Sequence, residues 1–497
     1  MRSRQAKGKR STATRLRTAL VALALLLVAA AAAVSWAIET LDVPPRVLAN
    51  HVARRASGHN EVTLTIGHRL AELLSWLDRS DDLTMNLPEL RLGAQAGSAS
   101  PSALASARVN VVLVATAADA AQAIQQAQPG DVITFVPGTY RFTGSGIAVN
   151  RAGTSTSGIV VRADRPGTVL LEFDMTEGFV VSEPHWTFEN LSIRGVCALH
   201  SSCEHAFHIV SRATRFIARN NTITEFNAHF KINGSDGKFP DDGLIEGNTL
   251  SNSSVRDTDS SVTPIDLVAA SRWVIRGNRI SDFAKAGSDR VSYGAFAKGG
   301  GAGNNFERNI VLCENLLRGV AGQRVGISLG GGGTGKEYCR DTRCITEQDS
   351  STIQSNLIMS CSDDGIYLNR SATSQVHHNT LIDTGGISVR FVESSADVAG
   401  NMVDGTVRSR DGGALHATDN VQTSMTRLYL GSHPVRALYR NLAGFDLSWA
   451  ASPPRRQRDE VAMPDLCGSE RPPRAAHGAF EDFSACLRQP QDQAPAR

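Results

Sequence analysis

The segment Ile245-Glu-Gly-Asn248-Thr-Leu250 returns in outline as Ile275-Arg-Gly-Asn278-Arg-Ile280. Four more segments share its frame of apolar residues around one asparagine: Phe306-Glu-Arg-Asn309-Ile-Val311, Ile353-Gln-Ser-Asn356-Leu-Ile358, Val376-His-His-Asn379-Thr-Leu381 and Val398-Ala-Gly-Asn401-Met-Val403. Successive asparagines are 30, 31, 47, 23 and 22 residues apart. A pattern that returns at this spacing predicts a solenoid, in which each repeat covers the apolar face of its neighbour.

The repeats alternate apolar and polar residues over short segments, which is typical of strands and not of helices. We therefore expect a parallel β-helix. We expect each repeated asparagine to adopt the left-handed backbone of a turn, and its amide to hydrogen-bond the equivalent asparagine one coil away. This pattern predicts the fold directly and the function only indirectly.

The composition fits a large solenoid with many turns. The 497 residues are 41% hydrophobic and only 6% aromatic, with 44 glycines, and a chain of this length can bury an extended core. The net charge is +2, but the first 18 residues hold seven basic side chains and no acidic one. The rest of the chain has 44 basic and 49 acidic residues, a net charge of −5, so we expect no nucleic acid among the partners.

Residues 1–38 have the pattern of a basic tail followed by a membrane anchor or signal segment. The 20 residues from Ala19 to Ile38 carry no charge and can span a bilayer, with the basic tail in the cytoplasm. A cleaved signal peptide is the alternative, because Ser35-Trp-Ala37 offers small residues to a peptidase. The length of the apolar run favours an anchor in the inner membrane, with the body in the periplasm or another extracytoplasmic space. Cleavage would make the protein secreted.

The eight cysteines indicate an oxidising compartment. Two pairs bracket short turn-like segments, one pair follows the repeated asparagines of consecutive coils, and the last two remain for the C-terminal segment. The disulfides we expect on this basis, out of 105 connectivities, are Cys197–Cys203, Cys339–Cys344, Cys313–Cys361 and Cys467–Cys486. Zinc binding is the alternative, but the chain has no Cys-x-x-Cys pair.

Residues 39–106 form a membrane-proximal segment in this interpretation. Leu70, Leu73, Leu74 and Leu77 share one face of a predicted helix over 67–79, which we expect to pack and not to bind a membrane or partner. Residues 94–106 are small and polar, as in a linker. We place the β-helix at 107–442, and a final coil with a Pro/Arg-rich tail at 443–497.

Two segments carry a resemblance to a known group. The alanine-rich stretch Ala117–Ala127, followed by Gln128-Pro-Gly-Asp131 and Pro137-Gly-Thr-Tyr140, resembles the N-terminal cap of carbohydrate enzymes of the pectate-lyase-like superfamily. Asp465-Leu-Cys-Gly468 and Gly478-Ala-Phe-Glu481 resemble their final coil. The resemblance covers about residues 108–482 and implies an all-β fold, a right-handed parallel β-helix with an N-terminal helical cap. It does not identify the reaction.

A second strand can be aligned in seven coils, from Phe207-His-Ile-Val210 to Ile387-Ser-Val-Arg390. Alternation places its first and third positions inside and its second and fourth positions outside. The outward positions are His208, Lys231, Asp266, Phe296, Ser328, Tyr367 and Ser388 in one column, and Asn233, Lys298, Gly330, Asn369 and Arg390 in the other. We expect His208, Lys231, Asn233, Asp266 and Asn369 to bind a polymer; an ordinary solvated surface is the alternative.

Lys298 is the candidate catalytic base. Ala295-Phe-Ala-Lys298-Gly-Gly, followed by Asn304-Asn-Phe-Glu-Arg-Asn309, resembles the catalytic-lysine coil of alginate and chondroitin lyases related to chondroitinase B. The resemblance implies that Lys298 removes the proton beside a uronate carboxylate, a reaction that also needs a cation for the carboxylate and an acid for the leaving oxygen. A solvated lysine between glycine turns is the alternative.

The sequence departs from these lyases at three positions. Gly330 stands where they have a catalytic arginine, and Val291 and Tyr293 stand where they have calcium-binding glutamates. Arg324 or Arg390 is the substitute we expect for the carboxylate, and Tyr367 the acid. We expect no cofactor and assign no metal ligand; the sequence does not identify ligands for a calcium ion.

The sequence thus favours an exported protein that acts on an acidic or envelope polysaccharide by lyase or C5-epimerase chemistry. A non-catalytic glycan-binding or envelope scaffold protein with the same fold is the second interpretation. A glycoside hydrolase is the third, because Cys361-Ser-Asp-Asp364 resembles the paired-aspartate segment of polygalacturonase-like hydrolases. In the non-hydrolase interpretations Asp363 and Asp364 are turn residues. The sequence indicates neither the polysaccharide nor the oligomeric state.

Overall fold

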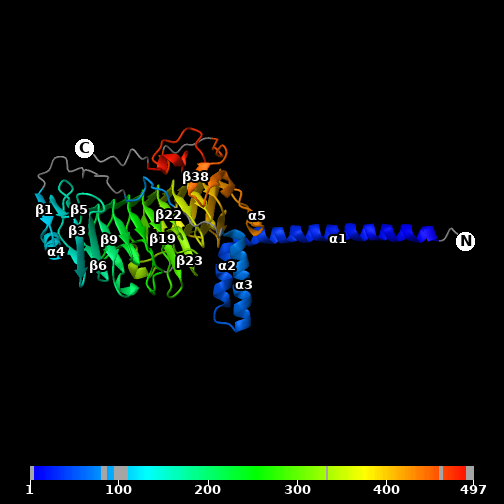
Figure 1. The fold of residues 1–497 in the computed structure, drawn as a ribbon, viewed down its shortest axis with the longest axis horizontal. Coiled ribbons are helices and arrows are strands. Elements are labelled where there is room, and N and C mark those ends of the chain that lie inside the picture. The colour runs from blue at the N-terminus through cyan, green and yellow to red at the C-terminus, as the bar shows by residue number, and fades with distance from the viewer. Residues whose placement is uncertain (1–4, 80–86, 95–109, 332–333, 458–462, 489–497) are drawn as a thin grey trace.

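The computed structural model describes residues 5–79, 87–94, 110–331, 334–457 and 463–488, and their side chains from residue 16 on. Three long sheets of 12, 10 and 11 parallel strands run along a solenoid, and a complete coil contributes one strand to each sheet (Figure 1). The parallel β-helix expected from the asparagine repeats is therefore confirmed.

The strands of each sheet follow one another in chain order. The 12-stranded sheet contains β1 (Asn110–Val114), β2 (Asp131–Phe135), β5 (Ile159–Ala163), β8 (Trp186–Glu189), β11 (Ile217–Arg219), β14 (Leu244–Glu246), β17 (Val274–Arg276), β21 (Asn305–Glu307), β25 (Thr352–Gln354), β29 (Ser374–His377), β32 (Ser395–Ala399) and β35 (Ala414–Thr418). The 10-stranded sheet contains β4 (Ile147–Val149), β7 (Glu177–Val181), β10 (His205–Val210), β13 (Ala228–Asn233), β16 (Ile265–Val268), β19 (Val291–Lys298), β23 (Gln323–Leu329), β27 (Ile366–Asn369), β31 (Gly386–Arg390) and β34 (Thr406–Arg410).

The 11-stranded sheet contains β3 (Gly138–Thr143), β6 (Val169–Asp174), β9 (Ser192–Gly195), β12 (Thr222–Thr224), β15 (Thr249–Ser251), β18 (Arg279–Ser281), β22 (Ile310–Leu312), β26 (Leu357–Met359), β30 (Thr380–Ile382), β33 (Met402–Val403) and β36 (Val421–Gln422). One small sheet contains β20 (Gly301–Ala302), β24 (Gln348–Asp349) and β28 (Ser371–Ala372). A second is the antiparallel pair of β37 (Tyr439–Asn441) and β38 (Asp446–Trp449).

The asparagine repeat forms a buried ladder at the turn between the 12-stranded and 11-stranded sheets. Each amide Nδ2 donates to the Oδ1 of the next asparagine at 2.9–3.1 Å, and the ladder extends beyond the predicted members to Asn221 and Asn420. Asn278 is typical. Its Nδ2 also donates to the Ile245 carbonyl at 2.9 Å, and its Oδ1 accepts from the Asn248 backbone N–H.

One detail of the ladder prediction is wrong. The left-handed residue is the one before the asparagine, with φ +61° at Gly247, +64° at Gly277 and +54° at Arg308. The asparagine that follows aims its side chain into the turn, where its amide satisfies backbone groups of the coil before it. The turn therefore needs a left-handed residue followed by an asparagine, and not a left-handed asparagine.

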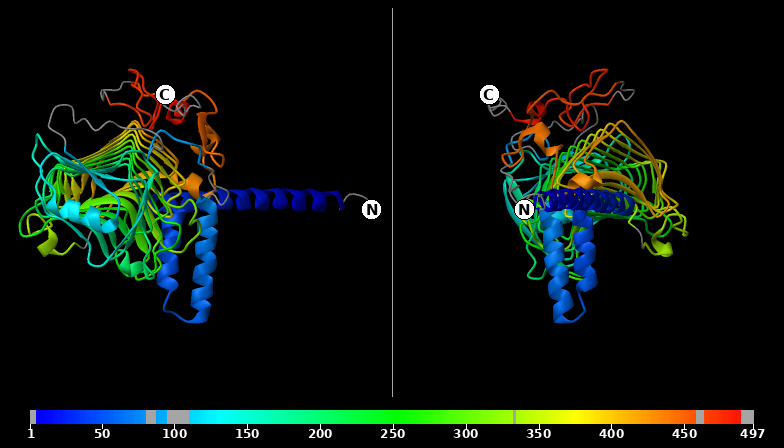
Figure 2. Two further views of the ribbon diagram at one scale, coloured as in Figure 1. Left: turned by 60° about the vertical axis from the view of Figure 1, so that its left-hand side comes forward. Right: turned by 90° about the vertical axis from the view of Figure 1, so that its right-hand side faces the viewer.

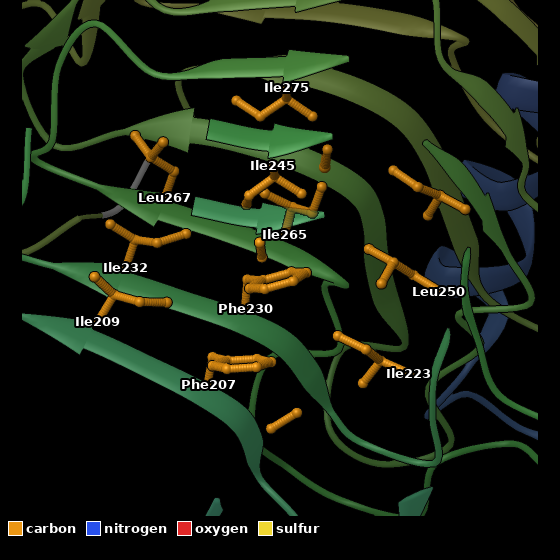
Figure 3. Close-up of a cluster of buried hydrophobic side chains, with 14 of the residues drawn as sticks. Phe207, Ile209, Ile223, Phe230, Ile232, Ile245, Leu250, Ile265, Leu267 and Ile275 are labelled. Atoms are coloured by element: carbon orange, nitrogen blue, oxygen red, sulfur yellow. The ribbon is translucent and has the colours of Figure 1, made fainter. Parts of the chain in front are cut away.

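The core is a column of apolar side chains from the inner faces of all three sheets. Phe207 and Phe230 stack one coil apart, with ring centroids 5.2 Å apart, and Ile209, Ile232 and Leu267 continue a neighbouring row (Figure 3). Like residues stack because parallel pairing in register repeats every position at one strand spacing.

The predicted N-terminal cap is confirmed as helix α4 (Ala117–Gln126), which buries Ala120 and Ile124 against the first coil. The side chain of Thr116 begins the helix by accepting a hydrogen bond from the Asp119 N–H. The helix covers the open end of the core, where stacked apolar side chains would otherwise meet water.

The C-terminal segment is not the final coil that the sequence suggested. The last strand of the three long sheets ends at Gln422, and helix α5 (Met425–Tyr429) follows. Residues 439–457 and 463–488 fold back over the outer face of the 11-stranded sheet (Figure 1). Phe480 and Phe483 pack there in one cluster with Ile310 and Leu357. The physical reason is that the strands of Ile310 and Leu357, β22 and β26, are apolar on both faces. Their outer face must therefore be shielded from water by another part of the chain.

All four predicted disulfides are present: Cys197–Cys203, Cys313–Cys361, Cys339–Cys344 and Cys467–Cys486. Cys313 and Cys361 join neighbouring coils, as expected from their places four and five residues after Asn309 and Asn356. Disulfides of this number are typical of an oxidising compartment.

The N-terminal region is helical. Helix α1 (Gln5–Leu41) contains one segment, Leu16–Leu41, that is long and apolar enough to cross a membrane and has no buried residue. This agrees with the expected anchor or signal segment. Helices α2 (Pro45–Ala56) and α3 (Glu61–Asp78) follow as an antiparallel hairpin beside the last coils (Figure 1). The predicted linker lies almost entirely outside the described residues.

Buried ion pairs attach this hairpin to the solenoid. The Arg46 guanidinium is fully buried and pairs with Asp78 of α3 at 2.8 Å and with Asp383 at 2.9 Å. Arg79 pairs with the buried Glu314 at 2.6 Å. Because breaking one partner of a buried pair leaves an uncompensated charge, these contacts hold the hairpin in one position.

The packing predicted for the leucine face of α3 is only partly correct. Leu74 is buried, but Leu70 and Leu73 are 44% and 52% exposed. The helix packs on α2 through another face, where Gly67 lies against Ala56.

The hydrogen bonds of the asparagine ladder allow a prediction of how much stability one asparagine contributes. Asn278→Ala removes the amide that bonds the Ile245 carbonyl and the acceptor of the Asn248 backbone N–H, at about 1–3 kcal/mol for each buried group, while Asn248 Nδ2 keeps the carbonyls of Ala218 and Glu246. We expect the free energy of unfolding to fall by about 3 kcal/mol, measured by urea titration of tryptophan fluorescence.

The matched control is Asn305→Ala, which removes a half-buried amide bonded to the Glu307 side chain. It should cost less than about 1 kcal/mol. Equal losses in the two variants would show that the ladder has no special role.

Candidate functional site

The outward side chains of the 10-stranded sheet form the candidate site, and we call them the polar face. Strand pairing joins His208 to Lys231, Lys231 to Asp266, Asp266 to Phe296, Phe296 to Ser328, Ser328 to Tyr367 and Tyr367 to Ser388, one coil per step. The predicted second-position column is therefore confirmed, although Asp266, Phe296, Ser328 and Ser388 are buried by their neighbours.

The N-terminal part of the polar face is a hydrogen-bonded cluster. His208 Nδ1 contacts Glu177 at 2.6 Å and its Nε2 contacts Asn233 Oδ1 at 2.8 Å. The Lys231 ammonium pairs with Asp266 at 2.8 Å. The hydrogen bond to His208 lowers the pKa of Glu177, so that carboxylate stays ionised.

Lys298 lies in the next part of the polar face, and its Nζ is 4.5 Å from the centre of the Phe296 ring. Tyr293 meets the same ring edge-on, with centroids 5.1 Å apart. Within the described ranges, the Lys298 ammonium makes no hydrogen bond or ion pair. It is therefore a half-buried cation that is available to an anion from outside.

Tyr367 and Arg390 form a pair beyond Lys298. The Tyr367 hydroxyl accepts from Asn369 Nδ2 at 3.1 Å and from Arg390 Nη1 at 3.3 Å. Burial raises the pKa of Tyr367, and Arg390 offsets only part of that effect, so the phenol keeps its proton at neutral pH. Arg390 also pairs with Asp411.

The spacing of these groups follows from the strand register. Tyr367 lies two coils from the strand of Lys298 and Arg390 lies three coils away, about 10 and 14 Å at the usual strand spacing. The polar face thus brings Lys298, Tyr367, Asn369 and Arg390 onto one line. Tyr367 contacts Asn369 and Arg390, whereas Lys298 lies two coils away, so a ligand that meets them all must extend across the coils.

Arg324 does not lie on the polar face. Its side chain is buried and its Nε donates to Glu314 at 2.6 Å, while its other nitrogens donate to carbonyls of residues 320 and 321. These bonds use the guanidinium within the fold, so Arg324 is committed to the structure of this turn.

Gly330 explains why the lyase arginine has no equivalent here. Its backbone is left-handed, with φ +74°, and a Cβ at this position would lie 1.9 Å from the Asn369 carbonyl oxygen. No side chain fits there without moving the next coil.

Asp363 and Asp364 lie at the edge of the polar face, close to Tyr293 and Tyr367. Asp363 accepts from Gln323 Nε2, and Asp364 pairs with the buried Arg408. Burial, and then the charge of Asp364, raise the pKa of Asp363 to about 7. A carboxyl group that keeps its proton near neutral pH can act as an acid.

The residues do not fit the calcium site of the resembling lyases. The two glutamate positions hold Val291 and Tyr293, and in the described part of the chain no group of three His, Cys, Asp or Glu side chains could hold a metal ion. We therefore derive no step through a metal.

Several buried polar atoms of this region make no hydrogen bond with the described residues. They are His205 Nδ1, Asp266 Oδ1, Asn369 Oδ1 and Ser388 Oγ. These atoms are enclosed by the protein and are not exposed to a ligand from outside.

Sequence reasoning missed His205 and Tyr293. In both strands one pair is missing from the ladder, at Ala206 and Gly294, while the register on either side is unchanged, and simple alternation therefore assigns His205 and Tyr293 to the wrong face. Burial lowers the pKa of His205 to about 4, which keeps this ring neutral beside His208 and Lys231. A skipped pair in the ladder is visible only once the strands are paired.

The chain matches the family model described as the right handed beta helix region over residues 145–426. No curated protein matches it. Among solved structures it is similar to pectate lyase Pel9A, at 14% identity and a TM-score of 0.48, over 78% of this chain and 100% of that one.

An alginate lyase from Paenibacillus sp. str. FPU-7 shows 17% identity and a TM-score of 0.36, over 63% of this chain and 99% of that one. A GH87 alpha-1,3-glucanase from Streptomyces thermodiastaticus shows 13% identity and a TM-score of 0.37, over 67% of this chain and 70% of that one. These similarities assign no activity. The family match covers more than half of the chain, and together with the three parallel sheets it shows that this protein belongs to the right-handed β-helix family.

Proposed function

We propose that the polar face binds an acidic polysaccharide and that the protein acts on it by lyase or C5-epimerase chemistry. The observation that carries the proposal is the unpaired Lys298 ammonium on one line with the Tyr367–Arg390 pair. A polymer with a carboxylate in each sugar can meet a cation at both ends of this line.

The chemistry needs three groups. A base removes the proton on the carbon beside the uronate carboxylate, and a cation stabilises the charge that develops on that carboxylate. In elimination, the electrons of the broken C–H bond form a carbon–carbon double bond, the glycosidic C–O bond breaks, and an acid protonates the leaving oxygen. In epimerisation, a proton returns to the opposite face of the same carbon.

Lys298 is the base in this proposal, and Tyr367, which keeps its proton, is the acid. Arg390, whose Nη1 lies 3.3 Å from the Tyr367 hydroxyl, is the cation proposed for the carboxylate of the reacting sugar. Lys298 can act as base only as the neutral amine, whereas as an ammonium beside the Phe296 ring it would bind a carboxylate. The competing role for Lys298 is therefore to bind the carboxylate.

We also propose that the protein is exported and remains anchored by α1. The support is the apolar segment Leu16–Leu41 after a basic tail, together with four disulfides. In this arrangement the substrate is a polysaccharide of the cell envelope or its surroundings.

Substitution of Lys298 tests the chemistry. We expect Lys298→Ala to lower the rate on uronic polymers at least about 100-fold, the usual size of a general-base contribution. The rate is followed by the ultraviolet absorbance of the new double bond, and by NMR of the sugar protons for epimerisation. Lys238→Ala, at an exposed lysine, is the matched control and should keep full activity.

Lys298→Arg separates base from carboxylate binder, because arginine keeps the charge but does not lose its proton. Loss of rate with retained polymer binding supports a base, whereas retained rate assigns Lys298 to the carboxylate. If the unchanged protein gives no product on any uronic polymer yet binds one, the glycan-binding scaffold replaces the enzyme.

A hydrolase is the second candidate, and the pKa of about 7 at Asp363 is the observation that favours it. Its products would be new reducing ends without ultraviolet absorbance. Against it, both Asp363 oxygens already accept hydrogen bonds, from Gln323 and from the Asp364 N–H, and Asp364 is paired with Arg408.

The state of Asp363 can be measured through stability. Its folded pKa of about 7 lies above the ordinary value of 3.8, so its contribution is fully present below about pH 4 and is lost as the pH rises through about 7. We expect Asp363→Asn to gain stability relative to the unchanged protein by about 1 kcal/mol per pH unit across that window. Urea titrations between pH 4 and 8 measure this difference, and a constant difference would mean that Asp363 is ionised throughout.

A further inference from the structure

Helix α3 carries an exposed apolar face. Its members are Val62, Ile66, Leu70, Leu73 and Trp76, which are 69, 63, 44, 52 and 67% exposed. At 100° per residue they fall in one sector of about 120°, which also contains the exposed Arg69, paired with Glu72. The buried residues Gly67, Leu74 and Asp78 point to a second sector, and His68 and Glu72 mark a third, exposed and polar.

The solenoid does not cover this apolar face, because α2 lies between α3 and the last coils. Arg46 and Asn50 of α2 bond to Asp383 and to the Ser362 carbonyl, at 2.9 and 2.8 Å. Helix α3 packs on α2 and reaches the solenoid through its C-terminal end, where the Leu77 carbonyl contacts His433.

The end of α1 is attached to the same body. Glu39 accepts hydrogen bonds from Thr426 of α5, and the Tyr429 hydroxyl donates to the Val43 carbonyl at 3.0 Å. Only three residues, Asp42, Val43 and Pro44, separate α1 from α2. The direction of α1 relative to the hairpin is therefore set by contacts on both sides of a short connection.

The hairpin runs across the direction of α1, and both turned views agree (Figures 1 and 2). If α1 crosses a bilayer, a hairpin across its end lies along the bilayer surface and not away from it. Trp36 near the end of the span is 72% exposed, and Trp76 near the end of α3 is 67% exposed. Tryptophan is enriched at the interface between membrane and water.

We propose that α3 rests on the outer surface of the lipid bilayer, with its apolar face in the headgroup region, as a second membrane contact beside α1. An amphipathic helix binds there through its apolar area. The exposed charges of the hairpin nearly balance, with Arg54, Arg55 and Arg69 against Glu61 and Glu72, so the contact is mainly apolar and needs no anionic lipid.

The contact would orient the whole protein. In Figure 1 the solenoid extends from the hairpin in the direction opposite to α1, so its last coils lie nearest the membrane and α4 lies farthest from it. Two contacts, one through the bilayer and one along it, restrict tilting more than a single helix does. The inference depends on α1 as an uncleaved anchor and not on the reaction at the polar face.

The test uses the full chain in vesicles of phosphatidylethanolamine and phosphatidylglycerol. All eight cysteines form disulfides, so a single introduced cysteine carries an environment-sensitive fluorophore. Leu73→Cys and Ile66→Cys report on the apolar face, and His68→Cys on the polar side of the same helix is the matched control. A second apolar position keeps the test valid if one variant folds poorly.

We expect blue-shifted emission at positions 73 and 66, with quenching by a phospholipid-bound quencher, and water-like emission quenched by iodide at position 68. Equal, water-like emission at all three positions would overturn the proposal. So would a blue shift that disappears when each nanodisc holds one protein, because a second copy of the chain would then cover the face. The same result in vesicles of phosphatidylcholine alone would support the apolar contact.

Discussion

The structure depends on parallel pairing in register between successive coils. Every backbone position of one coil stands one strand spacing from the same position of the next, so a residue type that recurs in sequence forms a continuous column in space. The buried asparagine ladder maintains this register at one turn. Its amides satisfy one another and the backbone of the coil before, and a coil that slipped would leave several of them unpaired.

The same register creates the polar face and limits what it can do. It aligns Lys298, Tyr367 and Arg390 along the solenoid, which suits an extended polymer and not a small molecule. It also brings the Asn369 carbonyl so close to Gly330 that no side chain can stand there. The reaction that we propose must therefore use cations other than an arginine at that position, and Lys298 and Arg390 are those that the face offers.

The asparagine spacing was sufficient to predict the solenoid, while the alanine-rich stretch Ala117–Ala127 and its resemblance predicted the helical cap, alternation predicted the outward column, and the positions of the cysteines predicted the four disulfides. The final coil was predicted wrongly, since the resemblance of residues 465–481 to a coil says nothing about what they cover. The left-handed backbone was expected at the asparagine, whereas it occurs at the residue before it. Several residue types precede the asparagine, among them Gly277, Arg308 and Ser355, and no single one marks the turn.

Sequence alone was thus enough to establish the repeat, and with it the class of fold and the side chains that share a column. Only the tertiary structure decided which of these side chains are available to a ligand. It engages Arg324 in a buried ion pair, leaves the Lys298 ammonium unpaired over an aromatic ring, and raises the pKa of Asp363 by burial. It also leaves one side of α3 exposed that the leucine spacing had suggested was packed. The physical reason is that repeat and alternation are local properties, whereas burial and charge pairing depend on residues distant in sequence, such as Arg46 and Asp383.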